Sequence, residues 1–402
     1  MNEAVGLIED IWEKDYENYF GTNFTDKSVT VKDIANAFGK VAMQTGKKPA
    51  LIYVIPRPQQ LELVLVTPSG QPIHKRVPEA SRDALLKQVQ TLRIAITKPS
   101  LRNTTNYLPA AQQLYQWIIA PLESELKAQN IETLLFCMGA GLRTLPLATL
   151  HDGKQFLVEK YSTARVPAFK LTDLVYTDLR NSPVLAMGMS EFKDRDPLPA
   201  VPVELSTIIK NLWPGKSFLN QEFTLANLQS QRASQFYKII HLATHASFRP
   251  GSPSNSYVEF WDTKLTLDQL RKLRWNNPPV GLLVLSGCQT AMGDEKAELG
   301  FAGLAVQANV TSAIASLWSV SDEGTLALMT QFYRDLKTAP IKAEALRLAQ
   351  IAMLKGQVSL EGGQLYTEQG KTPLPPELAT FENKNLSHPY YWAAFTVVGS
   401  PW

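Results

Sequence analysis

The sequence has few cysteines, no long hydrophobic run and little excess of charge of either sign. Its two cysteines, Cys137 and Cys288, are too few for the disulfide framework of a small secreted protein. No segment contains the roughly 18 to 20 uninterrupted apolar residues that a membrane-spanning helix requires. The first residues include Glu and Asp and lack the continuous apolar stretch of a signal peptide. We therefore expect a cytoplasmic protein without a membrane partner, in which a free thiol can persist.

The charge balance and the absence of repeats exclude two further classes. The 40 basic and 37 acidic residues are spread along the chain and leave a net charge of +3, which gives no reason to expect nucleic acid as a direct partner. No repeat period or low-complexity tract is visible, so a solenoid array is not expected. With 402 residues, 45% of them hydrophobic, the chain can bury a large core and is expected to form two units of ordinary domain size.

Hydrophobic patterns along the chain predict an α/β fold. The opening residues have apolar side chains at helical spacing, and a meander of strands is expected from Ala50. The apolar strand "TLLFCMG" contains Cys137, which we interpret as a packed thiol. From Ser182, apolar strands alternate with amphipathic helices, including a helix expected over "TLDQLRKLRW" and a loop and hairpin over "ASFRPGSPSNSYVEFWD". This alternation predicts a parallel sheet covered on both faces, with ligands beyond the carboxyl ends of its strands.

Two of these predicted strands end in reactive residues. "YKIIHLATH" ends at His245 and "GLLVLSGC" ends at Cys288. If the strands are parallel neighbours, the two side chains emerge at the same edge of the sheet. A thiolate is a strong nucleophile, and a nearby imidazole can take its proton and later return it to a leaving amine. The backbone N–H groups of Ala246 and Cys288 are the candidate donors for the oxyanion.

The same residues have three other interpretations. A single cysteine after an apolar strand is more often a packed thiol, and a histidine in a strand is more often a structural residue. A metal site formed by His241, His245 and Cys288 is not expected, because residues four apart on a strand are separated by about 13 Å. The pair of strand ends favours catalysis, and no metal or cofactor is expected.

Six sequence blocks resemble the CHAT family, caspase-like cysteine peptidases of the same clan as caspases and separases. They are "GLRTLPLATLHDGKQFLVEKY", "KIIHLATHASF", "LLVLSGCQTAMG", "ELGFAGLAVQANVTSAIASLWSVSDEGTLALMTQFYRDL", "KAEALRLAQIAML" and "HPYYWAAFTVVGSPW". The resemblance implies an α/β fold with a caspase-like, mostly parallel sheet flanked by helices and a preceding caspase-like pseudo-domain. It implies an N-terminal helical segment over residues 1–45, the pseudo-domain over 46–178 and the active peptidase domain over 179–402, each domain with its own sheet.

The same resemblance assigns roles to individual residues. His245 matches the family's general base and Cys288 its nucleophile. Many members of the clan have Gly after the histidine, where this chain has Ala246. Many CHAT proteins carry helical repeats ahead of the peptidase, so a regulatory protein or a helical-repeat region is the expected regulatory partner.

Ser286 and Asp322 are the candidate residues for substrate binding. In related peptidases, the position two before the nucleophile helps to line the pocket for the residue that precedes the cleaved bond, and here it is the neutral Ser286. Asp322 follows the strand "SAIASLWSV" and could select basic substrates. It would serve equally as the N-cap of the following helix, which is the interpretation we favour from the sequence.

The sequence therefore predicts a cysteine endopeptidase that cleaves a protein substrate through a His245–Cys288 dyad and an acyl-enzyme, activated by a partner. The alternative is a regulatory binding module of the same fold, with the dyad inactive or closed. A thiol acyltransferase using the same two residues is a third interpretation.

Overall fold

The computed structural model describes residues 2–291, 293–368, 370–374, 378 and 385–402. The helices are α1 (Asn2–Phe20), α2 (Val31–Thr45), α3 (Arg82–Thr97), α4 (Leu108–Ile118), α5 (Glu123–Ala128), α6 (Leu157–Lys160), α7 (Val201–Ser206), α8 (Leu225–Ser234), α9 (Glu295–Ala302), α10 (Leu304–Ala308), α11 (Asp322–Asp335), α12 (Lys342–Leu354) and α14 (Pro389–Trp392). The strands are β1 (Pro49–Pro56), β2 (Leu61–Val66), β3 (Ile73–Val77), β4 (Thr133–Met138), β5 (Ser162–Arg165), β6 (Val184–Gly188), β7 (Gly215–Leu219), β8 (Ile239–Phe248), β9 (Tyr257–Glu259), β10 (Lys264–Thr266), β11 (Leu282–Thr290), β12 (Ser312–Ser316), β13 (Ser359–Glu361), β14 (Gln364–Thr367), β15 (Gly370–Pro373) and β16 (Phe395–Gly399).

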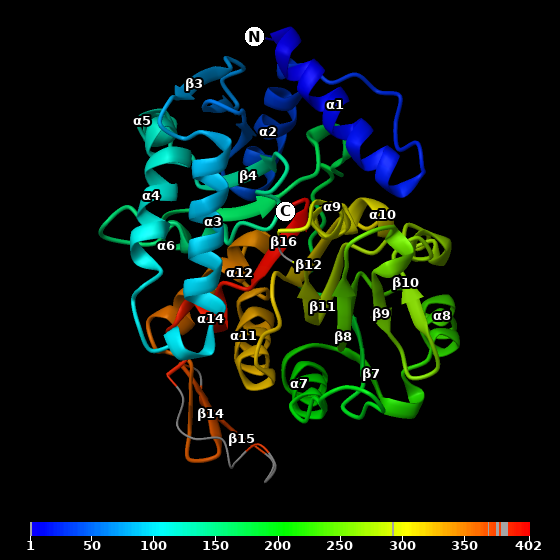
Figure 1. The fold of residues 1–402 in the computed structure, drawn as a ribbon. Helices are drawn as coiled ribbons and strands as arrows, with labels where there is room; N and C mark the ends of the chain where they lie inside the picture. Colours follow the sequence, from blue (N-terminus) through cyan, green and yellow to red (C-terminus); the bar gives the residue numbers. More distant parts are fainter. Residues whose placement is uncertain (1, 292, 369, 375–377, 379–384) are drawn as a thin grey trace.

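One large sheet runs through the described part of the molecule (Figure 1). Its strand order is β10-β9-β8-β11-β12-β16-β5-β4-β1-β2-β3, and β6 and β7 continue it beside the first half of β8. Strands β1, β4, β5, β6, β8, β11 and β12 belong to parallel pairs, whereas β2, β3, β9 and β10 form antiparallel hairpins. A separate three-stranded sheet, β13-β14-β15, projects from the body of the molecule (Figure 1).

The central strands form where the sequence is apolar without alternation. All residues of β4, β6, β12 and β16 are buried, which is typical of strands covered on both faces. Helix α12 packs on β5 and β16, α2 packs on β1, and α11 packs on β11. Cys137 lies fully buried in β4, as its interpretation as a packed thiol requires.

Strand β16 joins the strands of the first half of the chain (β1 to β5) and those of the second half (β6 to β12) into a single sheet. It pairs antiparallel with β12 of the second half and parallel with β5 of the first half. In Figure 1 it lies between the two groups of strands. The expectation of a separate sheet in each half is therefore wrong, because β16 hydrogen-bonds to both. The boundaries at residues 45 and 178 remain a prediction.

The segment "TLDQLRKLRW" does not form the expected α-helix. It begins as the last residue of β10 and continues in a single 3₁₀ turn at Leu270–Leu273. Arg274 then adopts a left-handed conformation with a φ of 50°, which ends the turn. The preceding segment forms the hairpin of β9 and β10, as predicted.

A buried charged cluster links α3 and the loop after β4 to α9, the helix that follows β11. Glu298 of α9 is fully buried and lies 3.1 Å from the Arg93 Nη2 atom of α3. Its carboxylate also accepts hydrogen bonds from the Gly141 backbone N–H at 3.1 Å and from the Thr144 hydroxyl at 2.8 Å. Removing one partner from such a buried pair costs about 3 to 5 kcal/mol. Helix α9 is thus held against α3 and the loop after β4.

Candidate active site

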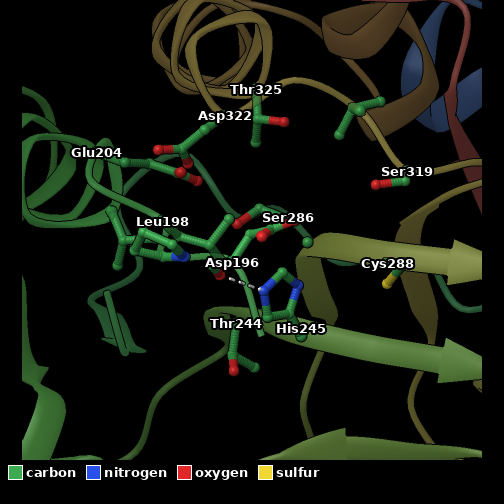
Figure 2. A pocket seen from close by; sticks show the side chains of 14 residues that line it. Asp196, Leu198, Glu204, Thr244, His245, Ser286, Cys288, Ser319, Asp322 and Thr325 are labelled. Atoms are coloured by element: carbon green, nitrogen blue, oxygen red, sulfur yellow. Dashed lines mark hydrogen bonds between the residues drawn. The ribbon is translucent and has the colours of Figure 1, made fainter. Parts of the chain in front are cut away.

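His245 lies in β8, half-buried, with its ring held on two sides. The imidazole packs against Phe192 with 4.4 Å between ring centroids. Its Nε2 atom lies 3.0 Å from the backbone oxygen of Asp196, the contact drawn as a dashed line in Figure 2. A carbonyl oxygen only accepts hydrogen bonds, so Nε2 carries the proton and Nδ1 is left as the basic nitrogen.

Burial lowers the pKa of His245 below its usual range, although the hydrogen bond to Asp196 opposes this shift. The imidazole is therefore neutral at pH 7. A neutral ring with a free Nδ1 atom is the form that can take a proton from a thiol.

Cys288 lies in β11 and is buried, with 1% of its surface exposed. Its thiol donates to the backbone oxygen of Leu285, with 3.4 Å between Sγ and O. Burial raises the pKa of this thiol to about 12. Forming the thiolate at pH 7 would then cost about 7 kcal/mol. At pH 7 the thiol is therefore protonated in this conformation.

The structure brings the backbones of these two residues together but not their side chains. The parallel pairing of β8 with β11 sets Gly287 opposite His245 and Cys288 opposite Ala246, after an irregularity between Leu285 and Gly287. Paired residues share a face of the sheet and successive residues alternate, so Cys288 points to the face opposite His245. Figure 2 shows the sulfur and the imidazole apart from one another.

The strand ends predicted at His245 and Cys288 are also wrong. Strand β8 continues to Phe248 and β11 to Thr290, because the two strands keep pairing beyond the reactive residues. Ala246 and Cys288, the two candidate oxyanion donors, consequently lie inside paired strands and not at turns.

A cavity of about 200 Å³ opens beside His245 (Figure 2). It lies between β8, β11, α7 and the start of α11. Both substrate-binding candidates predicted from the sequence, Ser286 and Asp322, line it together with His245 and Cys288. Ser286 occupies the irregularity of β11 and is buried.

Two carboxyl groups, those of Asp322 and Glu204, line the cavity. Asp322 accepts a hydrogen bond from the Ala200 backbone N–H. Burial raises the pKa of Asp322 to about 7, and the nearby Glu204 and Glu323 add to this shift. Glu204 of α7 is itself buried, and its Oε1 atom lies 2.8 Å from His241 Nε2.

The predicted capping role of Asp322 is wrong. Ser321 is the N-cap of α11, because its hydroxyl accepts from the Gly324 backbone N–H at 3.1 Å. Asp322 is the first residue of the helix, and its carboxyl group points into the cavity instead (Figure 2).

Sequence reasoning missed three residues of this site. Asp196 contributes only its backbone oxygen to His245, and no side-chain pattern marks such a contact. Phe192 lies in a loop whose path over β8 depends on tertiary packing. Glu204 carried a weak signal, because it is an acidic residue on the apolar helix "VPVELS".

Among the described residues, no group of His, Cys, Asp and Glu could hold a metal ion. Within the same residues, no helix is long and apolar enough to cross a membrane.

Comparisons with known proteins identify relatives of this fold. Residues 108–400 match the family model described as "CHAT domain". No curated protein matches the sequence. The separase–securin complex of Saccharomyces cerevisiae at 2.6 Å contains a chain that is 10% identical, with a TM-score of 0.53, and the match covers 98% of this chain and 34% of that chain. A structure of the same complex at 3.0 Å matches with 11% identity and a TM-score of 0.52 over 99% and 33% of the two chains.

The Arg-specific cysteine proteinase gingipain R (RgpB) is 10% identical with a TM-score of 0.42, over 79% of this chain and 73% of that chain. The chain spans about a third of the length of the chain that it matches in the separase–securin structures. The predicted caspase-like α/β fold, a large mostly parallel sheet flanked by helices, is confirmed.

The raised pKa of Asp322 predicts a stability that falls with pH. The unfolded chain loses this proton near pH 4, whereas the folded chain keeps it until about pH 7. The folded state therefore loses stability relative to the unfolded state as the pH rises from 4 to 7, by at most about 4 kcal/mol. Denaturant unfolding of the parent and of Asp322→Asn at pH 4.5 and pH 8 measures this, and the parent should lose more stability. An equal loss in the two proteins would contradict the assignment.

Proposed function

Because the chain belongs to the CHAT domain family, we propose that it is a cysteine endopeptidase using His245 and Cys288, and that the structure describes its closed conformation. The observation that carries this proposal is the orientation of His245. The Asp196 carbonyl holds the imidazole with Nδ1 as the basic nitrogen, beside a cavity that Cys288 also lines. A histidine with only a structural role has no need of a free nitrogen beside a cavity.

In the proposed reaction, residues 286–290 first repack so that the Cys288 Sγ atom reaches the face of His245. The thiol proton passes to Nδ1, and the thiolate attacks the carbonyl carbon of the peptide bond. The backbone N–H groups of Ala246 and Cys288 are the proposed donors to the oxyanion, once their segment has moved. His245 returns the proton to the leaving amine, and the C–N bond breaks to leave an acyl-enzyme. Water, deprotonated by His245, then releases the acyl group and restores the thiol.

The repacking step is required by the electrostatics of the closed conformation. The buried thiol has a pKa of about 12, and the partner of its Sγ atom among the described residues is the backbone oxygen of Leu285, which is not a base. Turning the thiol toward His245 supplies a base. We propose that a regulatory protein or a helical-repeat region stabilises the open arrangement, since nothing within the described residues holds the thiol there.

The two acids of the cavity support a preference for substrates with Lys or Arg before the cleaved bond. Asp322 and Glu204 are buried close enough for Glu204 to raise the pKa of Asp322. A cationic side chain entering the cavity would relieve this repulsion and stabilise both carboxylates. Ser286 is neutral and buried in the cavity wall, and its small side chain leaves room for the aliphatic part of the substrate's Lys or Arg.

The dyad is tested by substitution. Cys288→Ala and His245→Ala should each lower the cleavage of a protein or peptide-library substrate by at least about a thousandfold, because each removes a bond-making or proton-carrying group. Cys137→Ala, which removes the other buried thiol, is the matched control and should retain activity. The measurement is the rate of new amino-terminus formation, with circular dichroism to show that each variant is folded. Unchanged cleavage by either dyad variant would contradict the proposed role of the dyad.

The substrate preference is tested by peptide-library cleavage. The parent should cut after Lys or Arg, and Asp322→Asn should lower kcat/KM for these substrates about thirtyfold, the equivalent of about 2 kcal/mol. Asp335→Asn, in the same helix but outside the cavity, is the control. Cleavage after neutral residues in the parent, or equal effects of the two substitutions, would contradict the role of Asp322.

A regulatory binding module is the second candidate, favoured by the burial of Cys288 on the face opposite His245. The two candidates differ in the behaviour of the thiols. Iodoacetamide should label Cys288 and Cys137 equally slowly at pH 7 in the closed conformation, because both are buried with raised pKa values. A peptidase should label faster at Cys288 alone under conditions that support cleavage. Slow labelling of both thiols under every condition, together with no cleavage, would support the binding module.

A further inference from the structure

A second charged cluster lies near His245, along the edge of β8 that pairs with β9. Tyr257 of β9 stands opposite Ser247 of β8, two residues beyond His245. Three cations surround its ring. The distances to the ring centroid are 5.6 Å for the Arg195 guanidinium, 5.1 Å for that of Arg249 and 4.9 Å for the Lys264 ammonium.

The contacts of these cations leave positive charge unbalanced. Arg195 and Arg249 both donate to the single Tyr257 hydroxyl, the second at 3.1 Å. Glu259 pairs with Arg195 at 3.2 Å and with Lys264 at 3.9 Å. Within the described residues, no other carboxylate lies within 4.0 Å of the three cations. Two guanidinium groups that share one neutral oxygen repel each other, and an anion placed between them would relieve that repulsion.

The position of the cluster in the sheet decides which part of a substrate it meets. Strand β8 has β11 along one edge, where α11 with Asp322 at its start packs on β11, and β9 along the other. In the proposed reaction, His245 protonates the leaving amine, so the chain that follows the cleaved bond departs on the side of His245 away from Asp322. That side carries Tyr257 and its cations.

Resting on the proposed function, we propose that Arg195, Arg249 and Lys264, gathered around Tyr257, bind an acidic side chain of the substrate that lies within a few residues after the cleaved bond. Arg249 and Lys264 are exposed and can reach a bound peptide. Arg195 is more buried, and its salt bridge to Glu259 fixes the base of the subsite.

The test measures peptide binding to Cys288→Ala, which separates recognition from cleavage. Two fluorescent peptides share an Arg before the scissile bond and carry either Glu or Gln at the three positions after it. Anisotropy titration at about 50 mM salt should give the Glu peptide a roughly tenfold lower Kd, and about 300 mM salt should shrink the difference. Adding Arg249→Gln and Lys264→Gln should abolish it.

Lys272→Gln on the same background is the matched control, because it removes an exposed charge elsewhere on the second half. Equal Kd values for the two peptides, no binding of the Glu peptide, or an equal loss in the control would overturn the subsite. The proposed function fails separately. If Cys288→Ala prefers the Glu peptide, while the parent cuts no substrate and its Cys288 is labelled slowly by iodoacetamide under every condition, the subsite stands and the peptidase assignment falls.

Discussion

The pairing of β8 with β11 is the constraint on which the site depends. The two parallel strands carry His245 and Cys288, and the irregularity at Ser286 decides which residue of one strand stands opposite which residue of the other. With Gly287 opposite His245, the absence of a side chain lets the backbones approach closely, since a Cβ at Gly287 would lie 2.3 Å from the Thr244 oxygen. The same register sends the thiol to the opposite face. Close backbones and separated side chains are two results of one arrangement.

Charge is distributed asymmetrically around His245. Asp322 of the cavity lies at the start of α11, which packs on β11, whereas the cations around Tyr257 lie toward the β9 edge. An extended peptide laid across this part of the sheet would therefore meet opposite charges at its two ends. Such an arrangement defines a direction for the bound chain as well as a position. His245 lines the acidic cavity and also lies near Arg195, and its tautomer is fixed by the backbone carbonyl of Asp196.

Much of the fold could be predicted from the sequence, and the features that could not be predicted have two causes. Alternating apolar strands and amphipathic helices predicted the α/β fold. The sequence placed His245 and Cys288 on two strands, and the parallel pairing of these strands, a condition of the proposed dyad, is found in the structure. The face on which Cys288 lies could not be predicted, because "KIIHLATHASF" and "LLVLSGC" are apolar on both faces and a shift of one residue leaves their burial almost unchanged. The carbonyl of Asp196 and the pairing of β16 were missed because backbone contacts between distant segments leave no side-chain pattern.

The position of β16 in the sheet also determines when the sheet can be completed during synthesis of the protein. Residues 395–399 are made after both halves of the sheet, yet they fill the gap between β12 and β5. Until they leave the ribosome, each half ends in a strand with an unpaired row of N–H and C=O groups. Such rows readily pair with other chains. A nascent chain of this protein therefore spends the whole translation of the second half with an open edge at β5, and this is the interval in which it most needs protection from aggregation.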